Sequence, residues 1–278
     1  MTTHPPRTTA ERTAIFRALH AREGLFLIPN PWDVGTARML AALGFEALAT
    51  TSAGHAFSLG QDDNTLTREA TLAHAQEIVA ATDLPVSADL GNGFGDTPED
   101  VADTIRRAGE TGLAGASVED ATYDELRPVY DVGLAADRVR AAAEAAHGVP
   151  VPLVLTARAE NFIVGRPDLA DTIVRLQAFQ EAGADVLYAP GLLTLDDVRA
   201  VVTSVDRPVN VLAGIAGAGF TMADLSAAGV RRVSTGSALA RAAIGEFLRA
   251  ASEMRDNGTF GYVDGAASST AVARLLSR

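Results

Sequence analysis

Short apolar runs alternate with helix-like segments along most of this chain of 278 residues, and most of the runs end in polar or glycine residues. The third run ends at Asp89, and residues 91–95, which include three glycines, follow almost directly. Glycine suits positions where the backbone turns tightly or closely approaches a ligand. Thr97 and Pro98 then suit the start of a helix. The pattern predicts a strand, a loop and a helix, with a carboxylate at the strand's carboxyl end.

Eight such runs follow one another roughly thirty residues apart. The expected strands are 24–29, 45–51, 84–89, 113–118, 151–157, 183–190, 208–212 and 229–234. Repeated strand-then-helix units place the helices outside and bring the carboxyl ends of all strands to one face. We therefore expect a (β/α)8 TIM barrel, in preference to an open doubly wound sheet.

The chain ends are expected to lie outside the repeating units of one barrel domain over residues 1–278. Residues 1–23 form an N-terminal lead-in and helix, and residues 256–278 form a C-terminal loop and an extra amphipathic helix. That last helix has no position left to fill in the barrel. Its apolar face therefore predicts contact between subunits of a homo-oligomer.

Composition excludes several classes of function. A formal net charge of −12 argues against nucleic-acid binding, and no apolar run is long enough for a membrane span. The chain has no cysteine, which excludes disulfides, thiolate metal sites and a cysteine nucleophile. The N-terminal segment lacks the apolar core of a secretion signal. We expect a cytoplasmic protein whose partners are small molecules.

Four acids lie at or just beyond the ends of the second to fourth predicted strands: Asp63, Asp89, Glu119 and Asp120. In a barrel these carboxylates converge, and hard oxygen ligands suit Mg²⁺ that retains several waters. The alternative for each acid is a helix cap or an ion pair with a nearby arginine. For Asp89 together with Glu119 the metal interpretation is preferred.

Arg158 ends the fifth predicted strand at the same face. Its guanidinium could bind a carboxylate through two parallel hydrogen bonds, or stabilise the negative charge of a developing enolate. An ion pair with Glu119 or Asp120 is the compatible structural interpretation.

Two loops could add further groups. Residues 50–55 form a predicted loop of small polar residues whose N–H groups are free for an anion, and His55 in it could act as an acid or base. A structural role is the more common one for a lone histidine. Tyr123 and Arg127, in the loop after the fourth strand, could form a lid, or they could belong to a solvated connection.

Glycine-rich segments at 214–219 and 235–237 follow the seventh and eighth predicted strands. Barrels often bind phosphate at that place. This supports a second hypothesis, a phosphate-binding barrel isomerase or synthase that does not need Mg²⁺.

The chain resembles the isocitrate lyase/phosphoenolpyruvate mutase superfamily between about Leu25 and Ala240. The matching segments, in the family's order and spacing, are Pro29–Asp33, Thr50–Gly54, Ser58–Gly60 with Asp63, Ser87–Leu90 with Gly93–Gly95, Val118–Asp120, Ala157–Arg158 and Asn210–Gly214. The resemblance implies a (β/α)8 barrel, often with the last helix exchanged between subunits of a homodimer or homotetramer. It also implies Mg²⁺ and an α-keto acid or its enolate.

The resemblance also implies residue roles. It gives Ser52, Ala53 and Gly54 as a cradle for the substrate carboxylate, Asp63, Asp89 and Glu119 as the Mg²⁺ and water shell, Arg158 as the partner of the enolate, and Asn210 as a further pocket residue.

Three departures from the lyases of that family limit the comparison. Ser87 replaces a second metal carboxylate, and Ala121–Arg127 replaces a Lys-Arg-Cys-Gly-His gating loop. Pro190 and Gly191 stand where lyases place a glutamate that reads the substrate. Lyase specificity is therefore not transferred to this chain.

The leading functional hypothesis is a Mg²⁺-dependent enzyme that makes or breaks a bond at C3 of a pyruvate unit through an enolate held by the metal and Arg158. Cleavage of a small 2-hydroxy or 2-keto dicarboxylate is preferred over C–P chemistry on a phosphonopyruvate-like compound. Without a cysteine, protons would pass through water, His55 or Tyr123. A non-catalytic keto-acid binding protein is a further alternative.

Overall fold

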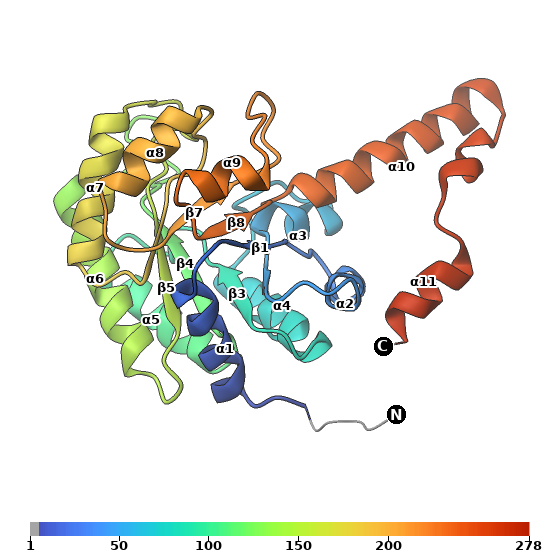
Figure 1. The fold of residues 1–278 in the computed structure, drawn as a ribbon. Coiled ribbons are helices and arrows are strands. Elements are labelled where there is room, and N and C mark those ends of the chain that lie inside the picture. Colours follow the sequence, from blue (N-terminus) through green and yellow to red (C-terminus); the bar gives the residue numbers. More distant parts are fainter. Residues whose placement is uncertain (1–5, 278) are drawn as a thin grey trace.

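A computed structural model describes residues 6–277, and within them eight parallel strands form one sheet that curls into a nearly closed barrel (Figure 1). The strands are β1 (Phe26–Ile28), β2 (Leu48–Ala49), β3 (Val86–Asp89), β4 (Gly115–Glu119), β5 (Val154–Arg158), β6 (Val186–Tyr188), β7 (Val209–Leu212) and β8 (Arg232–Ser234). Their order is β1-β8-β7-β6-β5-β4-β3-β2. At the remaining junction, the amide of Ala49 donates to the carbonyl oxygen of Pro29 at 3.1 Å. The predicted TIM barrel is confirmed.

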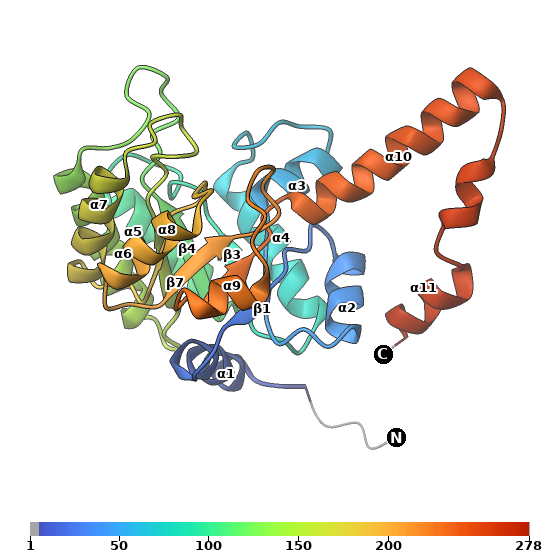
Figure 2. The same cartoon turned by 45° about the horizontal axis from the view of Figure 1, so that its top comes forward.

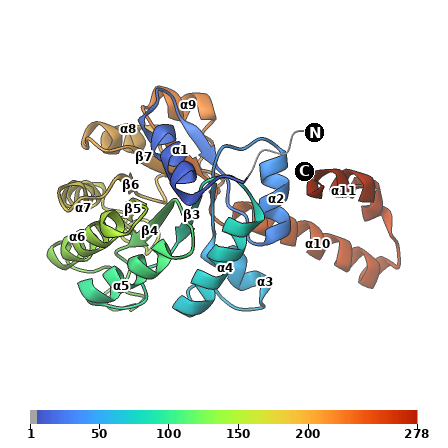
Figure 3. The same ribbon diagram turned by 90° about the horizontal axis from the view of Figure 1, so that it is seen from below.

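Helices alternate with the strands and follow the last of them, and most lie around the outside of the barrel (Figure 3). They are α1 (Thr9–Ala21), α2 (Val34–Ala42), α3 (Ser52–Ser58), α4 (Arg68–Ala81), α5 (Pro98–Gly109), α6 (Val132–Gly148), α7 (Leu169–Glu181), α8 (Leu195–Thr203), α9 (Met222–Ala227), α10 (Ala238–Asn257) and α11 (Ser269–Leu276), with a 3-10 turn at Gly261–Gly265. The predicted cap of α5 is present: the Thr97 hydroxyl accepts from the amide of Asp100, and the Asp100 carboxylate accepts from the amide of Thr97. The parts of the predicted end segments at residues 1–5 and 278 lie outside the described residues.

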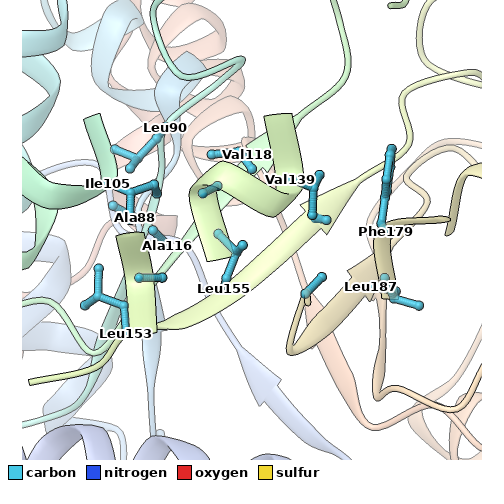
Figure 4. Packing of buried hydrophobic residues seen from close by; sticks show 14 of the residues in the cluster. Ala88, Leu90, Ile105, Ala116, Val118, Val139, Leu153, Leu155, Phe179 and Leu187 are labelled. Carbon is cyan, nitrogen blue, oxygen red and sulfur yellow. The ribbon is translucent and has the colours of Figure 1, made fainter. Parts of the chain in front are cut away.

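The main core lies between the strands and the outer helices (Figure 4). Strand residues that face away from the barrel interior, such as Ala116 and Leu155, lie in one buried cluster with Ile105 of α5, Val139 of α6 and Phe179 of α7. Burying a side chain of this size stabilises the fold by about 1.5–3 kcal/mol. This cluster holds each strand against its helix and so fixes the positions of the strand ends.

Helix α1 covers the amino-terminal end of the barrel, as the view from below shows (Figure 3). Phe16 of α1 is fully buried and packs edge-on against Phe26 of β1, with ring centroids 6.4 Å apart. A Cβ atom at Gly115 would lie 2.7 Å from the Phe16 ring. Glycine at the start of β4 therefore lets α1 approach closely and close this end of the barrel.

The predicted loop at residues 50–55 is wrong, because α3 begins at Ser52. Thr51 supplies the cap, and its hydroxyl accepts from the amide of Gly54 at 3.2 Å. A threonine in this position satisfies one of the first N–H groups of a helix. The second strand is correspondingly shorter than predicted.

The chain leaves the barrel at α10, which projects as a long arm, and α11 returns toward α2 (Figures 1 and 2). Only Ala240 is buried among the residues of α10, and none is buried in α11. Phe247 and Leu248 of α10 are 69% and 57% exposed. The extra C-terminal helix is confirmed. Among residues 6–277, none of the helices is both long and apolar enough to cross a membrane.

Candidate active site

A cavity of about 260 Å³ runs into the barrel from the carboxyl ends of the strands. The loops after several strands gather at this end (Figure 2). Its walls include three groups from separate elements: Asp89 at the end of β3, Arg158 at the end of β5 and Asp63 from the loop before α4. The parallel topology therefore brings together residues that are far apart in the sequence.

Arg158 connects the acids of this site. Its Nη1 lies 2.9 Å from Oδ1 of Asp89, its Nη2 lies 3.0 Å from Oε2 of Glu119, and its Nε lies 2.9 Å from Oε1 of Glu160. The ring of Tyr188 lies beneath the guanidinium, 5.2 Å from ring centroid to Cζ. Asp89 and Glu119 thus share the guanidinium of Arg158.

Burial sets the charge balance around Arg158. It raises the pKa of Glu119, and Arg158 offsets only part of that effect because Glu160 and Asp89 are further negative neighbours. Burial raises the pKa of Glu160 in the same way. Burial acts to lower the pKa of Arg158, but its carboxylate partners raise it well above its ordinary value. Three carboxylates therefore compete for one guanidinium, and the site holds an excess of acid.

Tyr123 reaches the same acids from the loop between β4 and α6. Its hydroxyl donates to Oε1 of Glu119 at 2.9 Å and accepts from the amide of Asn92 at 3.1 Å. Burial raises the pKa of Tyr123, and the charge of Glu119 adds to that effect. Gly91 leaves room for this hydroxyl, since a Cβ atom there would lie 2.7 Å from it. The loop after β4 is therefore tied to the site through Tyr123.

The acids that line the cavity suit a magnesium ion. Asp63 and Asp89 both lie on its wall, and Ser52 donates from its hydroxyl to Oδ2 of Asp89 at 3.2 Å. Burial raises the pKa of Asp63, and the negative charge of Asp89 raises it further. A hydrogen bond from Ser52 acts in the opposite direction and lowers the pKa of Asp63. A cation between these two carboxylates would relieve that repulsion, and oxygen donors are what Mg²⁺ prefers.

Direct coordination by three protein side chains is not what the structure offers. In the part of the chain from 6 to 277, no three histidine, aspartate or glutamate side chains gather as an ion's ligands would. Glu119 is buried behind Arg158 and is not on the cavity wall. Mg²⁺ usually keeps several waters and takes one or two carboxylates. The residues fit that kind of site.

The predicted substrate-binding residues separate into two groups. Ser52, Ala53 and Asn210 line the cavity. Gly54 does not, because it packs between Trp32 and Ala240 and its amide already donates to Thr51. The carboxylate cradle that the resemblance implied is therefore incomplete at Gly54.

Two other candidates lie away from the cavity. His55 is on α3 and its ring stacks on that of His74 of α4, with centroids 3.6 Å apart. Asp120 accepts from Nη1 of Arg175 at 2.9 Å and from the amide of Glu160 at 2.8 Å, so it ties β4 to the segment after β5. The structure brings neither side chain to the reacting groups.

The part of the predicted phosphate site that follows β8 is already filled by a side chain. The amides of Thr235 and Gly236 both donate to Oδ1 of Asn30 at 2.9 Å. The amide nitrogen of Asn30 in turn donates to the carbonyl oxygen of Thr50 at 2.9 Å. The N–H groups that would bind a phosphate after β8 are therefore used to join β8 to β1 and β2.

Sequence reasoning missed two parts of this site. Glu160 stands two residues after Arg158, at the spacing that returns a side chain to the same face of an extended segment, and that spacing was the available signal. Asn30 follows the first strand, but its partners are more than two hundred residues away in the chain. Only the closed barrel brings them together.

Comparison with known proteins agrees with this geometry. Residues 16–255 match the family model described as phosphoenolpyruvate phosphomutase. A crystal structure of a putative lyase/mutase from Burkholderia cenocepacia J2315 is 54% identical, with a TM-score of 0.95 over 97% of each chain. An uncharacterized protein of Mycobacterium tuberculosis is 34% identical over 224 residues, which are 80% of this chain and 81% of that protein.

A structure of 2,3-dimethylmalate lyase, which is described as a member of the PEP mutase/isocitrate lyase superfamily, is 27% identical. Its TM-score is 0.84, and the match covers 98% of this chain and 95% of that one. These matches extend over the whole barrel and all of its strand ends. This chain therefore belongs to the phosphoenolpyruvate phosphomutase family, and so to the isocitrate lyase/phosphoenolpyruvate mutase superfamily of enzymes, as the resemblance predicted.

Proposed function

We propose that this enzyme cleaves a C–C bond of a small 2-hydroxy or 2-keto dicarboxylate, with Mg²⁺ as its cofactor. In the preferred version the bond between C3 of a pyruvate unit and a hydroxyl-bearing carbon breaks. That hydroxyl gives its proton to water and becomes a carbonyl, and the electron pair of the broken bond is delocalised onto the keto oxygen of the pyruvate unit as an enolate. Protonation of C3 then gives pyruvate. The observation that carries the proposal is the set of three ion pairs of Arg158 at the end of the barrel.

Arg158 is the group that stabilises the new negative charge. Its guanidinium is held rigidly by Asp89, Glu119 and Glu160, so it needs no reorganisation when the oxygen becomes negative. A fixed donor aimed at developing charge in a water-poor site lowers the barrier more than the same donor in water. The carboxylates also keep Arg158 fully protonated.

Mg²⁺ would be held by Asp89 and Asp63, which both line the cavity, and it would supply positive charge for an oxygen that becomes negative. Ser52 and Ala53 line the same wall and are placed to orient a carboxylate of the substrate. Asn210 lies deeper, where its side chain donates to Ser234 at 2.9 Å.

We favour Tyr123 over His55 as the proton donor. Its hydroxyl lies at the acids of the site, whereas His55 stacks on His74 behind α3. Tyr123 is 46% exposed, but its raised pKa and its hydrogen bond to the Glu119 carboxylate keep the phenol protonated at neutral pH. The proton that reaches carbon can come from this hydroxyl or from water held beside it.

The test is a panel of 2-hydroxy dicarboxylates, 2-keto dicarboxylates and phosphonopyruvate, each assayed for released pyruvate with Mg²⁺ and with chelator. Wild-type activity should require Mg²⁺ and be lost in Asp89→Ala and Arg158→Ala. Arg199→Ala is the matched control, because Arg199 pairs with Asp196 on the exposed surface of α8. Pyruvate release that survives both site substitutions would refute the proposal.

Cleavage of phosphonopyruvate alone in this panel would instead favour the C–P version of the same site. Stabilisation of the protein by oxalate with Mg²⁺, without turnover of any compound, would favour the keto-acid binding protein. A homodimer or homotetramer is proposed as the functional assembly, with the apolar side chains of α10, among them Phe247 and Leu248, as the contact.

A further inference from the structure

A second arginine, Arg232, lines the same cavity and is only 5% exposed. Strand pairing relates it to the site: the paired positions run from Glu119 through Arg158, Tyr188 and Asn210 to Arg232. Residues that pair directly across neighbouring strands point to the same face of a sheet. Both arginines therefore face the barrel interior.

The two arginines lie at different depths. Arg158 is the last residue of β5, whereas Arg232 is the first residue of β8. The Nη1 atom of Arg232 lies 3.4 Å from Nε2 of His20, which belongs to α1 at the closed end. His20 donates from Nδ1 to the carbonyl oxygen of Phe16 at 2.8 Å, which leaves Nε2 as an acceptor. Arg232 thus forms part of the floor of the cavity.

The charge of Arg232 has no negative partner within residues 6–277, in contrast to Arg158. Its Nε donates to Oδ1 of Asn210 at 2.8 Å and its Nη1 donates to Oγ1 of Thr156 at 3.0 Å, and both acceptors are neutral. Burial lowers the pKa of His20 to about 3, so that contact is neutral too. In the described chain no hydrogen bond reaches Nη2. A buried guanidinium without a counter-ion is costly.

Hydroxyl groups line the same cavity as Arg232. Tyr188 and Ser234 are 8% and 6% exposed, and both line the cavity. Burial raises the pKa of Tyr188 to about 12, so its hydroxyl remains a donor at neutral pH. Ser117 adds another hydroxyl on the same wall. The cavity therefore combines one unneutralised cation at its floor with several hydrogen-bond donors on its walls, which is the chemistry that a carboxylate requires.

We infer that Arg232 binds the remote carboxylate of the substrate, whose reacting end lies at Arg158. This rests on the proposed function and narrows it to compounds with an anionic group at each end and a short spacer between them. The volume of about 260 Å³ limits the spacer to a few carbons. Arg232 supplies positive charge and a planar pair of donors, which lysine would not reproduce.

Calorimetric titration tests this with succinate as the dicarboxylate probe and pyruvate as the monocarboxylate probe, both in Mg²⁺. Arg232→Met should weaken succinate binding by between about tenfold and a hundredfold, the range for a lost hydrogen bond to a charged group. Pyruvate binding should stay within about twofold of wild type. Arg199→Met, on the exposed surface of α8, is the matched control.

A second variant tests the same inference if Arg232→Met does not fold. Asn210→Asp keeps the shape of a side chain that already contacts Nε of Arg232 at 2.8 Å, and it provides a built-in carboxylate. The folded protein should become more stable to heat, and succinate binding should weaken as in Arg232→Met. Wild-type succinate affinity in both folded variants would overturn the inference. The inference would also be wrong if chloride or sulfate raised the melting temperature of the protein and succinate did not change that temperature.

These measurements distinguish a failure of the proposed reaction from a failure of the inference about Arg232. If no compound of the panel releases pyruvate while succinate binding still depends on Arg232, the role of Arg232 in carboxylate binding is supported and the proposed reaction is refuted. If pyruvate is released from a monoanionic compound at the rate of the best dicarboxylate, the proposed reaction is supported and the role of Arg232 in carboxylate binding is refuted.

Discussion

The hydroxyl of Tyr123 lies 2.9 Å from Oε1 of Glu119, although the tyrosine comes from a loop and the glutamate from the end of a strand. The backbone of Tyr123 is left-handed, with φ of 62°, which is an uncommon conformation for a large side chain. This conformation accompanies the inward placement of the ring. The contact links the loop after β4 to the acids around Arg158.

Tyr123→Phe should lower kcat by about a hundredfold to ten-thousandfold, which is the usual contribution of a positioned proton donor. KM should change little, since the hydroxyl contacts Glu119 and the amide of Asn92. Steady-state kinetics on the best substrate of the panel measures both constants. Gly91→Ala provides a second route to the same defect, since its Cβ would lie 2.7 Å from the hydroxyl. Wild-type kcat in both variants would remove Tyr123 from the reaction.

Arg158→Gln should abolish detectable activity and also destabilise the fold. Removing the cation leaves the carboxylates of Asp89, Glu119 and Glu160 facing one another with side chains at most 19% exposed. Breaking a buried ion pair in this way costs about 3–5 kcal/mol of unfolding free energy. The loss should be partly recovered at pH 5.5, because burial raises the pKa values of Glu119 and Glu160 and favours their protonation there. Denaturant unfolding at pH 5.5 and 7.5 measures it. An equal loss at both pH values would show that the carboxylates are not the cause.

Glu119→Gln should flatten the dependence of wild-type stability on pH. Burial raises the pKa of Glu119 above its ordinary value of 4.5, so the folded protein keeps a proton that the unfolded chain has released. The free energy of unfolding therefore falls as pH rises from about 4.5 toward the raised value. The variant should reduce that slope by up to about 1.4 kcal/mol per pH unit. Glu99→Gln, on the exposed surface of α5, should leave the slope unchanged.

Mg²⁺ should raise the melting temperature of the wild-type protein, and Asp89→Asn should remove most of that rise. At a concentration one hundred times the dissociation constant, a bound ion adds about 2.7 kcal/mol. For a chain of this size each kcal/mol corresponds to roughly 2–4 °C. Asp196→Asn, on the exposed surface of α8, should respond to Mg²⁺ as the wild type does. Equal shifts in all three proteins would mean that the ion binds elsewhere.

The strand ends of this site could be predicted because parallel strands in a barrel share one open face. Asp89, Glu119 and Arg158 each end an apolar run, so their convergence followed once the repeating units were recognised. His55 was misplaced for a local reason: Thr51 caps a short helix where a loop was expected, and the helix turns His55 toward α4.

Other parts depended on pairings that no local pattern encodes. Arg232 interrupts the apolar residues of the last strand, and this was the available signal that it faces a polar interior. Its neutral partners come from β5, β7 and α1, which only the closed barrel brings together. Asn30 likewise fills the loop after β8 from the far end of the chain. Such long-range contacts decide which backbone groups remain free for a ligand.

Helix α1 seals the barrel beneath Arg232, with Phe16 seated on Gly115. Substrate and products therefore enter and leave through the opposite end of the barrel, and the products must leave in a fixed order. The product bound nearer the opening must dissociate first, because it blocks the exit of the product bound deeper in the barrel. A dead-end dicarboxylate that reaches the bottom would obstruct the next turnover, so product inhibition should differ between the two halves of the cleaved substrate.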